Sequence, residues 1–505
     1  MGDMSPTGVN GRGVLRRRLV AGAAAAMLAA GMAMTPASPA GGATSDNADA
    51  LQARVRAELG VFTGWLQANG AQGYIGEVGW PNNADTAAWN ALATKWYADA
   101  AAAGLWTTAW SAGEWWGCGY KLSVYVWSTC STMDGSLNAT RSSASVIEAQ
   151  AHPDRRGVNM SGGDFGTPGP LDATSAFSNA NPGTYNSAYH FDTQASYSYV
   201  ASRGITLVRL PVRWERVQPT LGGPLNPAEV QRIAEAVARA AAAGMRVIID
   251  IHNYGAYWLS NGSQGVRRPI GSAEVTVAHF AALWANLSTA FKANAGVAGY
   301  GLMNEPVGMA GPVAWEQASQ AAVTAIRQNA DAKLVLVPGY NWSGAQQWTS
   351  QHPRAWISDA YANIRYEAHH YWDRNNSAEY PNSYAAEVAD AQARGYTASA
   401  RPVIAGSGWY SDGTHAASGP GGSVIQVYAV NTVQLVPYNL VLATAGCAEI
   451  VATLNETTLY SGPSGLIGRV RGTIPVGTAP ATYSVCFRNV TGPPTATGGL
   501  TFTVT

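Results

Sequence analysis

Two glutamates each end a short apolar segment, and their types and positions are suited to acid–base chemistry. Glu77 lies in Gly-Tyr-Ile-Gly-Glu-Val-Gly-Trp, and Glu305 lies in Gly-Leu-Met-Asn-Glu-Pro. Both segments are typical of buried strands, and each is followed by a turn with Gly or Pro and then by a helical stretch. Cleavage of a glycosidic bond needs one protonated carboxyl to assist the leaving oxygen and one ionised carboxyl to attack or stabilise the oxocarbenium ion. Two strand-end glutamates meet that requirement.

Other polar and aromatic residues also stand at the ends of predicted strands. They are Arg209, His252, Asn304, His369, Tyr371 and Trp110. His369 and Tyr371 share one face of their strand because side chains alternate along it, whereas His370 points the other way. The chain therefore offers a set of groups able to position a sugar beside the two glutamates.

Each of these residues also has a simpler interpretation. An Asn-Glu-Pro tripeptide occurs by chance, His252 could be a hydrogen-bonded core histidine, and Arg209 could be an ordinary ion-pair partner. His369 and His370 could suggest a metal, but adjacent strand residues diverge. What favours a common site is that all of the candidates fall at strand ends.

The elements that must position these residues form a regular series. Two strands end near Glu77 and Trp110, and helical stretches are predicted at residues 49–70 and 85–103. Six more strands alternate with helices, at residues 157–160, 206–211, 246–252, 299–304, 334–338 and 364–370. One of these helices has Asn226 as its N-cap, Pro227 at its first position and Gly244 after its end. Eight alternating units predict an α/β fold, a (β/α)8 TIM barrel.

These motifs together resemble glycoside hydrolase family 5, the large cellulase family, over roughly residues 50–400. In that family Asn-Glu-Pro ends the fourth barrel strand and a Gly-Glu stretch ends the seventh. In this chain the Gly-Glu stretch comes first, so the resemblance implies a circularly permuted barrel with strand order 7-8-1-2-3-4-5-6. If residues 45–150 did not close the barrel, Glu77 would be missing from the site and the protein would at best bind sugars.

The resemblance also implies roles for the candidate residues. Glu305 would be the general acid/base, with a raised pKa, and Glu77 the nucleophile, kept ionised by Arg209. Asn304 would donate to the 2-hydroxyl of the sugar, and His252 would bind another hydroxyl. His369 and Tyr371 match the His-x-Tyr of the sixth strand, and Trp110 matches the tryptophan under the sugar at the cleavage point.

The domain boundaries follow from these assignments. We predict an export signal at residues 1–40, barrel units seven and eight at 45–150, and units one to six at 151–400. A Gly/Ser/Pro-rich linker at 401–423 precedes short alternating segments at 424–505, which predict a small all-β sandwich. That module weakly resembles immunoglobulin-like modules of secreted enzymes. It has no Trp to serve as a sugar platform, so a spacer or stabilising role is favoured over sugar binding.

The first 40 residues indicate a secreted protein. Arg16, Arg17 and Arg18 precede an apolar run from Leu19 to Met34, which is short and Ala-rich for a membrane span. A retained anchor is the alternative, and Sec and Tat export both remain open. Export makes the four cysteines candidates for disulfides, and the simplest pairs are 118 with 130 and 447 with 486.

The composition limits the partners. Only 12% of residues are charged and the formal net charge is zero, so no nucleic acid partner is expected. We expect no cofactor, no metal, no stable membrane association after signal removal, and a monomer. Eighteen Trp and 23 Tyr suit sugar stacking. Those near strand ends that could line sugar subsites are Trp110, Trp115, Trp116, Trp258 and Trp342.

The leading hypothesis is a retaining endo-β-1,4-glucanase acting on cellulose or a related β-glucan. A β-mannanase or a β-1,3/1,6-glucanase is the alternative within the same class, because specificity depends on loop contacts that the sequence does not define. A non-catalytic carbohydrate-binding protein is the alternative from another class.

Overall fold

The computed structural model describes residues 49–117, 119–129, 135–150 and 156–396, and within residues 415–504 it describes only the backbone of eight strands. The expected export signal and both expected disulfides depend on residues or side chains outside this described part.

Eight parallel strands form a closed barrel, as the sequence predicts. In chain order they are β1 (Gly73–Val78), β2 (Trp106–Ala112), β5 (Arg156–Met160), β7 (Leu207–Val212), β8 (Arg246–Ile251), β11 (Val297–Gly301), β12 (Leu334–Pro338) and β13 (Ile364–His369). Each strand pairs with its neighbours in the chain order, and β13 closes the ring by pairing with β1, with Glu77 opposite His369. The first and last strands of the barrel therefore bring these two residues together.

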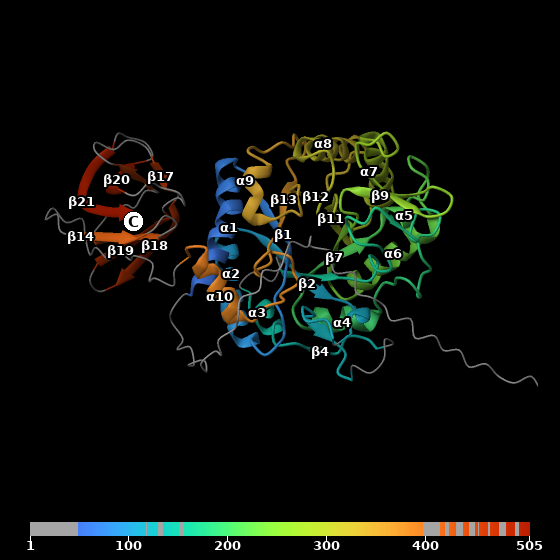
Figure 1. Cartoon of the computed structure of the whole chain (residues 1–505), viewed down its shortest axis with the longest axis horizontal. Coiled ribbons are helices and arrows are strands. Elements are labelled where there is room, and N and C mark those ends of the chain that lie inside the picture. Colours follow the sequence, from blue (N-terminus) through green and yellow to red (C-terminus); the bar gives the residue numbers. More distant parts are fainter. Residues whose placement is uncertain are drawn as a thin grey trace, which may run out of the picture.

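Helices surround the barrel (Figure 1). The longer ones are α1 (Ala50–Ala68), α2 (Thr86–Ala102), α4 (Gln194–Ser202), α6 (Pro227–Ala242), α7 (Val277–Phe291), α8 (Pro312–Gln328) and α10 (Tyr384–Ala393). Short ones are η1 (Glu114–Trp116), α3 (Ala144–Glu148), α5 (Trp214–Val217), η3 (Ala345–Gln347) and α9 (Trp348–Gln351). The Asn226 side chain accepts from the Ala228 amide and caps α6 as expected. Among the described residues no helix combines the length and the apolar character that a membrane crossing requires.

The first helix is tied to the last barrel unit, and Figure 1 shows α1 beside α9 and α10. The buried Arg54 of α1 donates to the backbone carbonyls of Trp372 and Asp373. Glu58 lies 3.1 Å from His370 Nε2, and the Trp96 indole donates to the other His370 nitrogen. Buried polar groups are costly unless they are paired, so these bonds fix the start of the described chain against the barrel.

Small sheets lie outside the barrel. In one, β6 (Thr174–Ser175), β9 (Ala256–Ser260) and β10 (Gly265–Pro269) pair, and in the other β3 (Tyr125–Val126) pairs with β4 (Ala139–Thr140). The strands of the C-terminal region are β14 (His415–Gly419), β15 (Val424–Val430), β16 (Tyr438–Ala443), β17 (Ile450–Ala452), β18 (Leu454–Gly462), β19 (Gly465–Thr473), β20 (Ala481–Asn489) and β21 (Pro494–Val504). The strands from residue 424 onward agree with the predicted alternating segments, whereas β14 falls within the predicted linker at 401–423. A separate sandwich module stays a prediction.

Candidate active site

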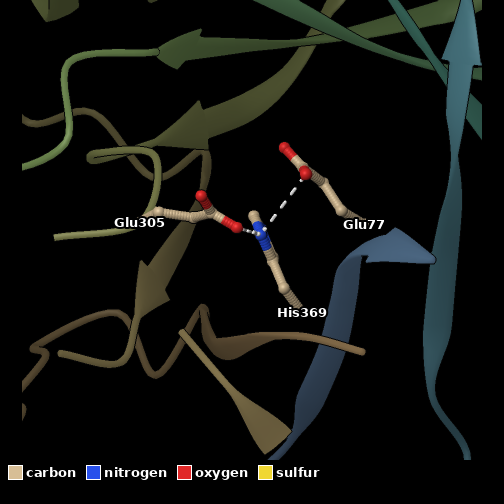
Figure 2. Close-up of side chains that lie close together, drawn as sticks. All are labelled: Glu77, Glu305 and His369. Atoms are coloured by element: carbon tan, nitrogen blue, oxygen red, sulfur yellow. Dashed lines mark hydrogen bonds and ion pairs between the residues drawn. The ribbon is translucent and has the colours of Figure 1, made fainter. Parts of the chain in front are cut away.

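Glu77 and Glu305 meet at the carboxyl end of the barrel strands. Glu77 is near the end of β1 and Glu305 follows β11, and their side chains are 5% and 14% exposed. One carboxylate oxygen of each, together with a ring nitrogen of His369, lies within 4.8 Å of the others (Figure 2). Carboxylate oxygens this close leave little room for a water between them.

His369 lies between the two glutamates. Its Nδ1 is 2.8 Å from Glu305 Oε1 and 3.5 Å from Glu77 Oε2, and its Nε2 is 3.4 Å from Glu367 Oε1. Burial lowers the pKa of His369, but the surrounding carboxylates outweigh burial and raise it to about 10. The imidazole is therefore protonated and donates on both sides.

Glu77 is held by two donors. Arg209 Nη1 donates to its Oε1 at 3.2 Å, and the Tyr371 hydroxyl donates to its Oε2 at 2.7 Å. Burial raises the pKa of Glu77 to about 7, against the lowering effects of His369, Arg209 and Tyr371. Arg209 pairs with Glu77 as expected. Arg209 lowers the pKa of Glu77, in the direction expected for holding it ionised, but desolvation is the larger effect.

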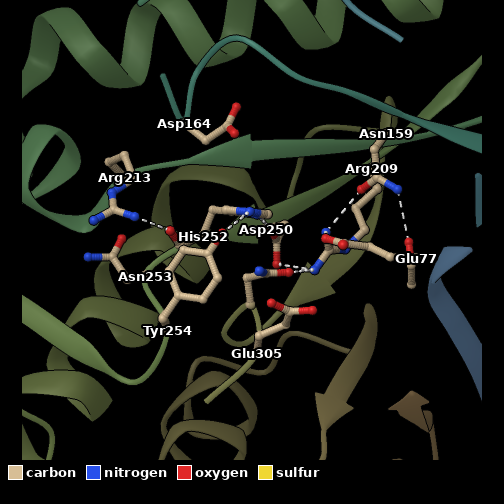
Figure 3. A network of polar contacts seen from close by, with 12 residues as sticks. Glu77, Asn159, Asp164, Arg209, Arg213, Asp250, His252, Asn253, Tyr254 and Glu305 are labelled. Atoms are coloured by element: carbon tan, nitrogen blue, oxygen red, sulfur yellow. Dashed lines mark hydrogen bonds and ion pairs between the residues drawn. The ribbon is translucent and has the colours of Figure 1, made fainter. Parts of the chain in front are cut away.

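Arg209 is fully buried and joins several strands (Figure 3). Its Nη2 lies 3.0 Å from Asp250 Oδ1, 3.0 Å from Glu367 Oε1 and 2.8 Å from Asn304 Oδ1. Its Nη1 also donates to Asn159 at 3.0 Å. A planar guanidinium with several fixed donors orients all of these side chains at once.

Asn304 is buried, and its Oδ1 accepts from Arg209. Its Nδ2 has no partner among the described residues. A buried amide donor without a partner is costly, so this one is available to a ligand. That agrees with the expected bond to a sugar hydroxyl.

His252 and Trp110 lie against each other at the same end of the barrel. Their rings stack at 5.6 Å, and Trp110 is 8% exposed. His252 Nδ1 is 2.8 Å from Asp250 Oδ2, and its Nε2 is 3.2 Å from the Tyr254 hydroxyl. Burial lowers the pKa of His252 to about 3, so this ring is neutral. A neutral histidine thus contacts Asp250 and a charged histidine contacts Glu367, the two carboxylates that pair with Arg209 Nη2.

The backbone is strained at the site. Glu305 has φ 42° and Tyr254 has φ 56°, both in the left-handed region that non-glycine residues rarely adopt. Trp342, whose ring lies 6.1 Å from that of Tyr254, has φ 64°. Such strain persists only where the surrounding structure enforces it, and it concentrates at functional sites.

The structure brings together all eight predicted site residues, but one aromatic expectation was wrong. Trp258 lies on β9 and is 2% exposed, so it is a core residue and does not line a sugar subsite. Trp115 instead stacks on His190 at 4.0 Å, and Trp116 stacks on Tyr120 at 3.9 Å.

Two acidic residues beneath the site were not predicted from the sequence. Asp250 and Glu367 are both fully buried and both pair with Arg209. The alternation of β13 contained the signal for one of them, because Glu367, His369 and Tyr371 are spaced to share one strand face. Asp250 and His252 are related in the same way on β8 and beyond its end.

A second cluster, like the first, contains two carboxylates and one histidine. It consists of Glu114, His190 and Asp192, with ligand atoms within 4.8 Å of one another. Glu114 Oε1 accepts from the Thr193 amide, the Thr193 hydroxyl and the Ser196 hydroxyl, at 3.0, 2.6 and 2.6 Å. Asp192 accepts from the Glu114 amide at 2.8 Å. These bonds tie the segment after β2 to the start of α4.

Both clusters contain three groups of the kinds that bind metals. A metal needs a neutral imidazole with a free lone pair, whereas His369 carries a proton and donates to carboxylates on both sides. The first cluster is therefore a poor metal site as it stands. The expectation of no metal and no cofactor stays a prediction.

A cavity of about 1000 Å³ lies at the opposite end of the barrel, where the strands begin. Its lining includes Arg246, Lys292, Lys333 and Arg365, with Asp331 as its acidic member. It contains no pair of carboxyls, so the chemistry predicted from the sequence belongs to the other end.

A closed parallel barrel with two close glutamates at its carboxyl end is an arrangement that barrel glycosidases use. The model of the family "Cellulase (glycosyl hydrolase family 5)" matches residues 163–410, a little under half of the chain. Residues 163–410 are thus similar to glycosyl hydrolase family 5, and the relatives below are similar to the chain over part of their length.

The chain is 30% identical over 258 residues to the manganese dependent endoglucanase Eg5A of Phanerodontia chrysosporium, covering 49% of this chain and 61% of that protein. It is 31% identical over 231 residues to endoglucanase EG-II of Hypocrea jecorina, covering 44% of this chain and 53% of that protein. The chain thus spans about half to three fifths of the length of these curated relatives. Pseudomonas stutzeri endoglucanase Cel5A, solved with cellobiose, is 35% identical with a TM-score of 0.39, covering 44% of this chain and 62% of that one.

Proposed function

We propose that this chain is a secreted retaining glycoside hydrolase that cleaves β-1,4-glucan, with Glu305 as acid/base and Glu77 as nucleophile. The observation that carries the proposal is the approach of the two carboxylates within 4.8 Å at the carboxyl end of a closed barrel. Two of the similar proteins are named endoglucanases and another is named endo-β-1,4-glucanase A, which supports β-1,4-glucan as the substrate.

The reaction takes two steps. In the first, Glu305 protonates the glycosidic oxygen while Glu77 attacks the anomeric carbon and forms a covalent glycosyl-enzyme. In the second, Glu305 takes a proton from water, which attacks the same carbon and releases Glu77. Arg209 and Tyr371 orient the attacking carboxylate, and the free Nδ2 of Asn304 donates to the 2-hydroxyl of the sugar.

The barrel is proposed to be circularly permuted relative to the family. The family match begins at residue 163, so β1, β2 and β5, with Glu77 and Trp110, lie outside it. These strands nevertheless complete the ring between β13 and β7. A ring has no intrinsic first strand, so moving the termini to the connection between β13 and β1 leaves every strand pair in place.

The roles of the two glutamates are tested by replacing each with Ala and adding azide, a small anion that can substitute for a missing carboxylate. On an aryl β-cellobioside, Glu77→Ala with azide should give a product of inverted configuration, and Glu305→Ala with azide should give a retained one. Unchanged turnover of a soluble β-glucan by Glu77→Ala would remove it as the nucleophile.

The substrate is tested on a panel of glucan, mannan and β-1,3/1,6-glucan. Faster release of reducing ends from mannan or from the β-1,3/1,6-linked polymer would assign the alternative specificities of the same family. Binding by calorimetry without hydrolysis of any polymer would instead indicate a carbohydrate-binding protein. Export from the cell, a monomeric state and a spacer or stabilising role for residues 424–505 are part of the same proposal.

A further inference from the structure

Glu367 is an acidic side chain that the proposed reaction does not use. It lies on β13, is fully buried, and faces the interior of the barrel beneath the two catalytic glutamates. Its Oε1 contacts Arg209 Nη2 at 3.0 Å and His369 Nε2 at 3.4 Å, whereas its Oε2 has no partner among the described residues. Glu367 Oε1 therefore contacts both Arg209, which pairs with Glu77, and His369, which pairs with Glu305.

The neighbouring strand leaves room for this carboxylate. A Cβ atom added to Gly76, the residue before Glu77, would lie 2.0 Å from Glu367 Oε1 and 2.9 Å from His369 Nε2. A Cβ on Gly301 would likewise lie 2.9 Å from Asp250 Oδ1. The glycine of the Gly-Glu stretch is thus required by the acid behind it, since any larger residue would displace that acid.

The charges around Glu367 argue against a purely structural role. Glu77 from β1, Asp250 from β8, Glu305 after β11 and Glu367 itself face Arg209 from β7 and His369 from β13. Arg209 is already paired with Asp250. A further buried carboxylate, Glu367, therefore costs stability through repulsion and desolvation and is not needed to neutralise Arg209. What Glu367 adds, and Asp250 does not, is the contact with His369.

We propose that Glu367 is a positioning residue, which fixes the His369 ring through Nε2 so that the Nδ1 proton faces both catalytic carboxylates. This inference rests on the proposed function for its catalytic meaning. The pKa of Glu367 is held below its usual value, because Arg209 and His369 outweigh burial, so the carboxylate is ionised when it binds the ring. Without it, His369 loses one of the three carboxylates that keep it charged.

The test compares Glu367→Gln with the matched control Asp250→Asn. Both remove a buried carboxylate from Arg209, but only the first removes one that contacts His369. The pKa of His369 is measured by NMR on protein with 15N-labelled imidazoles, and its resonance is identified by its loss in His369→Asn. We expect Glu367→Gln to lower this pKa by about one to three units and Asp250→Asn to lower it by less than about half a unit.

On a soluble β-glucan, Glu367→Gln should lower kcat by about 10- to 100-fold with little change in KM, since the ground-state contacts to the sugar are untouched. If Glu367→Gln does not fold, Glu367→Asp takes its place: it keeps the charge but withdraws it from the ring, and should give an intermediate shift. An unshifted His369, or equal shifts in Glu367→Gln and Asp250→Asn, would overturn the inference. The titration of His369 needs no substrate, so it tests the role of Glu367 even if the protein hydrolyses no glycan. Absence of hydrolysis would refute the proposed function and leave this inference standing.

Discussion

Two buried clusters at the carboxyl end of the barrel have the same composition, two carboxylates and one histidine, and they differ in what binds them. They are Glu77, Glu305 and His369, and Glu114, His190 and Asp192. In the second cluster Glu114 Oε1 accepts three hydrogen bonds from Thr193 and Ser196, and the cluster ties two segments of chain together. In the first, the carboxylates face a shared histidine, an arginine and each other.

The comparison teaches that composition and spacing alone do not identify a catalytic site. Glu114 is bound by backbone and hydroxyl donors that stabilise the fold. Glu77 is bound by Arg209 and Tyr371, and in both clusters burial, and after it the neighbouring carboxylate, raises the pKa of the glutamate. A raised pKa is therefore common to both clusters, and what distinguishes the first is the ion pair of Glu77 with the buried Arg209.

The largest expected difference between the clusters is in activity. Glu77→Ala or Glu305→Ala should lower kcat/KM on a soluble β-glucan by about 10⁴-fold or more, because each removes a reacting group. Glu114→Ala should lower it by less than about tenfold, because Glu114 touches no reacting atom. Reducing-end assays on the three folded variants check this, and a collapse of activity in Glu114→Ala would erase the distinction.

The second difference is in stability. Glu114→Ala leaves the Thr193 and Ser196 donors without their acceptor, and should lower the free energy of unfolding by about 2–4 kcal/mol. Denaturant unfolding followed by tryptophan fluorescence measures the change. Glu114→Gln, which keeps an acceptor oxygen, is the matched control and should lose much less.

A third prediction concerns Tyr371, whose hydroxyl donates to Glu77. Tyr371→Phe should lower kcat/KM by about 10- to 100-fold, because a hydrogen bond to a charged group is lost. Since that bond lowers the pKa of Glu77, its loss should move the acidic limb of the kcat/KM profile from near pH 7 to higher pH. A limb that stays in place would show that Tyr371 does not act on Glu77.

The smallest predicted effect is on the stability of the first cluster, and its sign is opposite to that expected for Glu114→Ala. The pKa of Glu77 rises from 4.5 to about 7 on folding, so the folded state binds more protons between these values and stability falls as pH rises through them. Glu77→Gln removes the buried charge and should raise the free energy of unfolding by about 1–2 kcal/mol at pH 8, and by much less at pH 5. Parallel denaturant titrations at the two pH values measure this, and a loss of stability at pH 8 would contradict it.

The periodicity of the sequence was enough to predict the barrel. Each of the eight strands appears close to its expected bounds, because parallel strands buried on both faces are continuous apolar runs between turn residues. The capped helix that begins at Pro227 was predicted for the same kind of local reason. Local patterns therefore defined the ring and the ends of its strands, where the candidate residues stand.

Contacts between distant segments were not predictable in this way. Glu114 meets His190 and Asp192 only through the fold, and nothing near any of them in the chain marks the others as partners. The Asn-Gly pair at 261–262 does indicate the β9–β10 hairpin, but the burial of Trp258 depends on what packs against that hairpin in the fold. The raised pKa of Glu77 reflects desolvation, a property of the assembled site rather than of the residue.

The pairing of β1 with β13 determines when, during synthesis of the chain, the proposed site can be completed. During synthesis Glu77 leaves the ribosome early, whereas His369 and Tyr371 are among the last barrel residues to emerge. A chain arrested before β13 has the proposed nucleophile but an open edge in place of these two partners. The proposed site is therefore complete only when the final strand closes the ring.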